Sequence, residues 1–290
     1  MKLKIKRRIV SLFLSVLLIF SLLAVWGNTA LELNEYTVCS AEIPAQFSGF
    51  RIAHVSDVHN TEMGDDNKKL LSVLREAEAD IIAITGDLID SRNTDIEIAL
   101  SFAEKAVQIA PCYYVTGNHE ARVAEYDELK KRLVELGVVV LDNKRVDLEK
   151  NGEALTFIGV DDPDFTTDYL FDDSKSVIEM QMQRLYDEDS GYTVLLSHRP
   201  ELFDVYSENG ADLILSGHAH GGQFRIPGIG GIYAPHQGFF PEYDAGVYID
   251  GDTSMIVSRG IGNSIFPLRV NNRPEVVLIE LSDDLSAGNN

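Results

Sequence analysis

The feature that most constrains the fold of this chain is a series of short apolar runs, several of which end directly in Asp, Asn or His. The runs are rich in Ile, Val, Leu and Tyr, a composition typical of buried β-strands. We therefore expect strands over residues 50–55, 80–85, 112–116, 138–141, 155–160, 192–197, 211–216, 254–257 and 275–281.

Helical patterns lie between several of these runs. In residues 67–79 the apolar side chains recur every three or four positions, as on the buried face of a helix. Similar patterns cover residues 95–109, 126–136 and 174–187. Alternating strands and helices predict a parallel or mixed α/β sheet. No internal repeat or linker divides the body, so we expect one domain over residues 50–282.

The N-terminal segment is expected to be a separate unit. Residues 9–26 contain no charged side chain, and their length is at the short end of what spans a membrane as a helix. Five Lys and Arg residues precede them, which predicts a cytoplasmic basic segment over residues 1–8. We expect a single-pass anchor in the cell membrane, a lead-in over residues 27–49, an extracytoplasmic body and a disordered tail over residues 283–290. The alternative is secretion after signal-peptide cleavage, although no Ala-x-Ala triplet follows the apolar run.

The charge of the chain limits its partners. The formal net charge is −21, and such an acidic surface repels nucleic-acid backbones. A phosphate substrate is not excluded, because bound divalent metals invert the local field. The two cysteines, Cys39 and Cys112, match no zinc-site spacing and leave a single disulfide open. Nothing in the sequence predicts the oligomeric state.

Polar side chains follow five of the expected strands. In α/β sheets, loops from separate strands converge beyond the carboxyl ends of the strands and form sites there. Glycines before three of these polar residues allow tight turns. The candidate residues are Asp57 and His59, Asp87 and Asp90, Asn118 with His119 and Glu120, His198 with Arg199, and His218 with His220.

These side chains form a mixed set of oxygen and imidazole ligands. Such a set suits Mn²⁺, Fe²⁺ or Zn²⁺ better than Ca²⁺ or Mg²⁺. The ligands are too many for one ion, and the lack of thiolates argues against a structural zinc. Two ions that share a carboxylate lie about 3.5–4 Å apart, lower the pKa of a bridging water and clamp a phosphoryl group. The pattern therefore predicts a two-metal centre for phosphoester chemistry.

The ordered motifs resemble the five-block signature of calcineurin-like metallophosphoesterases over residues 50–281. The blocks are Asp57-x-His59, Gly86-Asp87-x-x-Asp90, Gly117-Asn118-His119-Glu120, His198 and Gly217-His218-x-His220. The resemblance implies a four-layer αββα sandwich. It places Asp57, His59 and His220 on a first metal, Asp87 between the metals, and Asn118, His198 and His218 on a second.

The resemblance also implies an activity. A metal-bound hydroxide would attack phosphorus in line, with Mn²⁺ the first choice of metal, and His119 would assist the leaving group beside Asp90 or Glu120. Asn118, His119 and Arg199 are candidate substrate contacts. The chain is more closely similar to the membrane-anchored branch of the family, some members of which act on UDP-2,3-diacylglucosamine. An outward-facing site would have no access to that nucleotide sugar, so the expected substrate is a phosphomonoester or phosphodiester, with a lipid or envelope component as one candidate.

Two other classes of function stay open: a non-catalytic metal-binding scaffold on the same fold, and a lipid-binding module. His54 lies within the first expected strand and is expected to be a hydrogen-bonded core residue, and His236 a loop residue. The aromatic group of Phe239, Phe240 and Tyr243 fits a pocket wall, a membrane-facing patch or the core.

Overall fold

The computed structural model describes residues 2–166, 173–187, 190–264 and 266–286, and the end of the predicted disordered tail lies outside these ranges. Two six-stranded mixed sheets make up the body of the described chain. The first has the order β1 (Glu32–Cys39), β16 (Glu275–Ser282), β2 (Arg51–Val55), β3 (Ile81–Thr85), β4 (Cys112–Val115) and β5 (Val139–Val140). The second has the order β14 (Gly246–Asp250), β15 (Thr253–Val257), β9 (Leu213–Ser216), β8 (Thr193–Leu196), β7 (Glu153–Gly159) and β6 (Lys144–Lys150).

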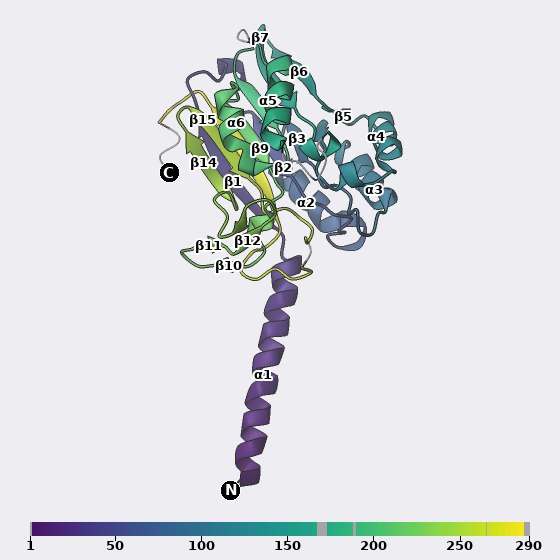
Figure 1. The fold of residues 1–290 in the computed structure, drawn as a ribbon, viewed down its shortest axis with the longest axis vertical. Helices are drawn as coiled ribbons and strands as arrows, with labels where there is room; N and C mark the ends of the chain where they lie inside the picture. Colours follow the sequence, from purple (N-terminus) through teal and green to yellow (C-terminus); the bar gives the residue numbers. More distant parts are fainter. Residues whose placement is uncertain (1, 167–172, 188–189, 265, 287–290) are drawn as a thin grey trace.

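Helices and two small hairpins complete the described part of the chain (Figure 1). The helices are α1 (Lys2–Thr29), α2 (Lys68–Ala77), α3 (Ile96–Ala106), α4 (Tyr126–Glu135), α5 (Ser174–Leu185) and α6 (Phe203–Glu208). One hairpin pairs β10 (Arg225–Ile226) with β11 (Gly230–Gly231), and the other pairs β12 (Tyr233–Ala234) with β13 (Gly238–Phe239). Both hairpins follow β9 in the chain.

Three apolar clusters define four layers. Between the sheets, side chains such as Ile52 and Val115 of the first sheet pack with Phe157 and Leu215 of the second. The opposite face of the first sheet is covered by α2, α3 and α4, whose apolar side chains are buried there. The opposite face of the second sheet is covered by α5 and α6. The predicted α/β class is therefore confirmed, and the layers are helix, sheet, sheet and helix.

Parallel pairing brings the predicted strand-end motifs together. β2, β3 and β4 are parallel neighbours in the first sheet, as are β8 and β9 in the second. Their carboxyl ends therefore lie on the same edge of each sheet. The two edges meet, because the Nδ1 atom of His198 after β8 lies 2.7 Å from the carbonyl oxygen of Thr85 at the end of β3.

The structure corrects the predicted start of the domain. Residues 27–49 were expected to be a lead-in, but β1 pairs in parallel with β16 along its whole length. The first sheet thus begins at Glu32, because β1 lies before all nine runs for which strands were expected. β6 and β14 were also not predicted; both are edge strands, and β6 consists mostly of charged residues, so it has no continuous apolar run. Cys39 and Cys112 both carry free thiols.

The N-terminal helix α1 projects from the body as a single rod (Figure 1). Within the described ranges no helix has the length and apolarity that a membrane crossing requires. The segment over residues 9–26 is helical as expected, and its role as a membrane anchor stays a prediction. The predicted location outside the cytoplasm depended on that anchor and stays a prediction.

His54 gives the fold a testable pH dependence. It is fully buried in β2, with Nε2 2.7 Å from the Thr85 hydroxyl oxygen, and burial lowers the pKa of His54 to about 3. A histidine in the unfolded chain titrates near pH 6.5, so the unfolded state binds more protons below that pH. The stability that neutral His54 contributes is complete above pH 6.5 and decreases as the pH falls toward 3, by up to about 1.4 kcal/mol per pH unit.

We expect His54→Gln to flatten this dependence. Urea unfolding of wild type and variant between pH 7 and pH 4 measures the free energy of unfolding at each pH. The difference between the two proteins should shrink as the pH falls. Free energies that run parallel over the whole range would show that His54 does not carry the effect.

Candidate metal centre

Seven polar side chains from five loops converge where the two sheet edges meet. They follow β2, β3, β4, β8 and β9, and all are buried. Five have a left-handed backbone, with φ between 48° and 65°. Such backbone is costly for non-glycine residues and is retained mainly where a site requires it. The seven are Asp57, His59, Asp87, Asn118, His198, His218 and His220, and the five left-handed residues are Asp57, His59, Asp87, His218 and His220.

The loops hold one another in place through backbone hydrogen bonds. The amide of Asp57 donates to the Gly86 carbonyl at 3.1 Å, and the amide of His218 donates to the Asp57 carboxylate at 3.0 Å. Gly217 is required beside this carboxylate, because a Cβ atom there would overlap Asp57 and Ser56. The loop after β9 therefore passes directly against the loop after β2.

The side chains form two groups of ligand atoms, each with its atoms within 4.8 Å of one another. In the first group, His220 Nε2 lies 3.2 Å from Asp57 Oδ1 and 3.1 Å from His59 Nε2. In the second group, His198 Nε2 lies 3.2 Å from Asp87 Oδ2 and 3.1 Å from His218 Nδ1. Asp87 Oδ2 also lies 3.4 Å from His59 Nε2, so this carboxylate stands between the groups.

The donor set fits two cations. The side-chain oxygen of Asn118 is buried and has no hydrogen-bond partner in the described structure, as expected of an oxygen directed at an ion. Burial raises the pKa of Asp57, but His220 and His59 outweigh it, and the pKa stays below its usual value. Burial lowers the pKa of His198, but Asp87 outweighs it and raises the pKa to about 10. Ionised carboxylates that are buried need positive charge close by to be stable, and divalent ions would supply it.

Two further groups of potential ligands are already engaged. In the group of His59, Asp90 and His119, the Asp90 carboxylate binds Arg92 Nε at 2.9 Å. In the group of Glu201, His218 and His236, His236 Nδ1 lies 2.7 Å from an Arg199 nitrogen, whose positive charge disfavours a metal ion. We assign no ion to either group.

His119 presents a proton to the centre. Its Nδ1 accepts a hydrogen bond of 2.9 Å from the Ser91 amide, so the proton of the neutral ring is on Nε2. Nε2 lies 4.0 Å from Asp87 Oδ2, on the side of the ligand groups. Asp90 comes only within 3.5 Å of Nδ1 and binds Arg92 through its side chain. Asp90 thus lies beside His119 as expected and holds Arg92, and its catalytic role stays a prediction.

Arg199 does not have the position expected of a substrate contact. Its side chain is almost fully buried, and its guanidinium binds Asp162 and Asp164 at 2.5–2.8 Å. It also donates toward His236, which stacks on His218 with ring centroids 5.0 Å apart. Arg199 thus supports His236 from behind, and the predicted contact between Arg199 and phosphate is corrected.

Sequence reasoning did not single out two arginines of the cleft, and it allowed His236 only as a possible contact at the rim. The cleft has a volume of about 220 Å³ and contains Arg92, Arg122 and His236 beside Asn118 and His119. Arg92 and Arg122 lie two residues after Asp90 and Glu120, so their place in the motif loops was a usable signal. His236 lies 18 residues after His218, and no motif spacing indicated it.

Two groups of potential metal ligands joined by one carboxylate, at the strand ends of an αββα sandwich, are the arrangement expected of a two-metal hydrolase. Residues 50–222 match the calcineurin-like phosphoesterase family, and the chain belongs to this family. It is 30% identical to the uncharacterized metallophosphoesterase YkuE of Bacillus subtilis, over 87% of this chain and 85% of that protein. It is 27% identical to the phosphodiesterase YaeI of Escherichia coli, over 80% of this chain and 82% of that protein.

A solved structure shows the same fold. TT1561 of Thermus thermophilus aligns with a TM-score of 0.51 and 13% identity, over 74% of this chain and 91% of that chain. With the family membership, this makes the protein a metallophosphoesterase, a hydrolase of phosphoric ester bonds.

Proposed function

We propose that the protein hydrolyses phosphodiesters at a centre of two divalent metal ions. The observation that carries the proposal is that both ligand groups, the His119 Nε2 atom and two arginines converge on one cleft. The similarity to YaeI, which is named a phosphodiesterase, supports the diester.

The ligand groups divide between the two ions. Asp57, His59 and His220 would hold the first ion. Asn118, His198 and His218 would hold the second ion, and Asp87 would bind both ions. When bound, two such ions neutralise phosphate oxygens and lower the pKa of a bound water. The mixed oxygen and nitrogen set suits Mn²⁺, with Fe²⁺ or Zn²⁺ as alternatives.

The charges around the cleft favour a diester over a monoester. Arg92 is paired with Asp90, and Arg122 binds Asp164 at 2.7 Å, so neither adds a full uncompensated charge. At neutral pH a monoester carries about two negative charges and a diester one. Because the arginine charges are largely balanced, the chain's own residues suit the less charged substrate.

The first test is hydrolysis of bis(4-nitrophenyl) phosphate and 4-nitrophenyl phosphate by the full chain. We expect a higher kcat/KM for the diester, loss of activity with a chelator and recovery with Mn²⁺. Separate titrations with Fe²⁺ and Zn²⁺ identify the metal that gives the highest kcat. Activity that persists after metal removal would contradict the proposal.

His119→Ala tests this hydrogen-bond donor separately. We expect kcat for the diester to fall about 10²- to 10³-fold, as for the loss of one hydrogen-bond donor to the charge that develops in the transition state. The metal content, measured by atomic emission, should stay the same, because His119 Nε2 donates and its Nδ1 is bound to Ser91. Loss of a bound ion in this variant would make His119 a ligand instead.

A further inference from the structure

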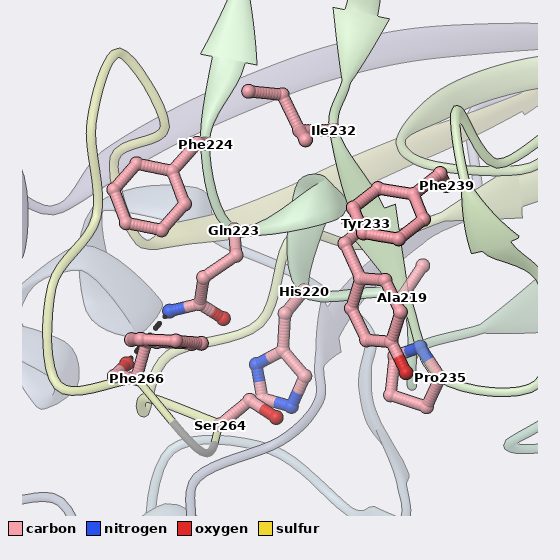
Figure 2. A pocket seen from close by; sticks show the side chains of 10 residues that line it. All are labelled: Ala219, His220, Gln223, Phe224, Ile232, Tyr233, Pro235, Phe239, Ser264 and Phe266. Carbon is pink, nitrogen blue, oxygen red and sulfur yellow. Dashed lines mark hydrogen bonds between the residues drawn. The ribbon is translucent and has the colours of Figure 1, made fainter.

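An apolar cavity of about 410 Å³ adjoins the metal centre. Figure 2 shows Phe224 and Phe266 along one side and Tyr233 and Phe239 along the other, with His220 near Ser264. Such a volume lies within the range of about 300–1,000 Å³ that is usual for small-ligand sites. The cavity is therefore large enough for a substantial part of a substrate.

The cavity borders the catalytic cleft. His220, Pro235 and Ser264 line both spaces. His220 presents Nε2 to Asp57 at 3.2 Å in the metal centre, while its ring also borders the apolar space. A group bound in the cavity would therefore lie next to a phosphate held at the metal ligands.

The walls of the cavity are held by hydrogen bonds. The amide nitrogen of Gln223 donates to the carbonyl oxygen of Phe266 at 2.9 Å, which joins two sides of the cavity. The amide of Ile232 donates to the carbonyl oxygen of Phe224 at 2.9 Å. Gly222 passes so close to Gly231 that a Cβ atom on either would overlap the other backbone. The cavity is thus part of the packed structure and is not left by a loose loop.

The lining indicates the chemistry of the occupant. Most lining residues are apolar, and the side-chain nitrogen of Gln223 already donates to the carbonyl oxygen of Phe266 in the cavity wall. A sugar or a base bound there would lose its hydrogen bonds to water without replacement, which is unfavourable. An alkyl or acyl chain gains from the same burial, about 0.8 kcal/mol for each methylene group.

The entrance is also apolar. Phe239 is 74% exposed and Phe266 61% exposed, and both line the cavity. Apolar side chains gathered at one place on a surface usually mark a binding site. This end of the body is the one from which α1 leaves (Figure 1), and the Arg273 guanidinium lies 4.7 Å from the Trp26 ring there.

We propose that the cavity binds an alkyl or acyl chain attached to the scissile phosphate, so that the substrates are lipid-like phosphodiesters. The inference rests on the proposed phosphodiesterase function and adds the substrate class. In the reaction a water oxygen forms a bond to phosphorus and the bond from phosphorus to the leaving alcohol breaks. The leaving oxygen accepts a hydrogen bond from His119 Nε2 as its negative charge develops. The water gives one proton to the solvent, and a leaving alkoxide takes one proton from the solvent, so the step balances.

The test compares methyl 4-nitrophenyl phosphate with hexyl 4-nitrophenyl phosphate, which release the same nitrophenol. We expect kcat/KM of the full chain to be at least about tenfold higher for the hexyl ester. Phe239→Asp, which brings a charge to the cavity mouth, should reduce this ratio to within about threefold while the methyl ester is still hydrolysed.

Phe240→Asp is the matched control. Phe240 is the next residue and 64% exposed, but it is not among the residues that line the cavity. Its φ of 56° also suits Asp better than Phe, so the variant should fold. The control should retain the wild-type preference for the hexyl ester. An equal loss in both variants would mean general surface adsorption and would overturn the inference, as would equal kcat/KM for the two esters in wild type.

Binding without turnover separates this inference from the proposed function. Calorimetry of chelator-treated protein with alkyl phosphonates of two to eight carbons should show Kd falling about two- to fourfold for each methylene group. Phe239→Asp should abolish that trend and Phe240→Asp should retain it. If neither ester is hydrolysed but the trend is present, the proposed activity fails and the chain site stands. If both esters are hydrolysed and the trend is absent, the chain site fails alone.

Discussion

Asp87→Asn should abolish phosphodiester hydrolysis and leave fewer than two metal ions per chain. The Asp87 Oδ2 atom lies 3.2 Å from His198 Nε2 and 3.4 Å from His59 Nε2, so one oxygen serves both ligand groups. The asparagine side chain is neutral, and only one of its two terminal atoms is an oxygen that can bind a metal ion. Loss of the charge stabilisation that a shared ion provides is worth several kcal/mol, which corresponds to a decrease in kcat of about a thousandfold or more.

The measurements are kcat for the diester and metal content by atomic emission. The fold should tolerate the change, because Asp87 Oδ1 accepts the His119 amide at 2.8 Å and an amide oxygen can do the same. Asp90→Asn is the matched control, since Asp90 is in the same loop but binds Arg92. The control should keep both ions. Wild-type activity in Asp87→Asn would show that the carboxylate is not a shared ligand. It would therefore contradict the two-metal assignment.

Glu120→Gln should destabilise the folded protein by about 2–4 kcal/mol. The Glu120 carboxylate is fully buried and accepts four backbone hydrogen bonds of 2.8–3.2 Å, from Asp87, Leu88, Ile89 and Gly117. The nitrogen of a glutamine amide cannot accept, so half of these buried donors would lose their partner. Burial, and after it the Asp87 carboxylate, raises the pKa of Glu120 to about 7, so the carboxylate is mostly ionised at pH 8.

Urea unfolding at pH 8 measures this effect, and Glu97→Gln is the control. Glu97 is an exposed residue that pairs with Arg132, so its substitution should change the midpoint little. The variant at position 120 should also lose activity, because the loop that carries Asp87 is no longer held against the loop after β4. Unchanged stability would show that the four hydrogen bonds do not hold the loops.

Much of the fold follows from local patterns. All nine predicted strands occur in the structure, because buried strands such as β3 and β8 consist almost entirely of apolar residues. The four predicted helices also occur, with bounds that coincide or differ by at most three residues. The short helix α6 and the charged edge strand β6 were missed, because α6 is too short for a helical repeat and β6 has no continuous apolar run. The edge strand β14 was missed as well, although Val247, Tyr248 and Ile249 are apolar.

The sequence by itself determined which residues carry the chemistry, since Asp57, Asp87 and His218 each follow a strand at its carboxyl end and parallel strands end on one edge. Only the tertiary structure decided what surrounds them. It placed Arg199 behind His236 and directed the Glu120 carboxylate at the Asp87 loop. It also brought Phe224, Tyr233 and Phe266 around one cavity next to His220. Those arrangements depend on contacts between segments far apart in the chain, which no local spacing of residues encodes.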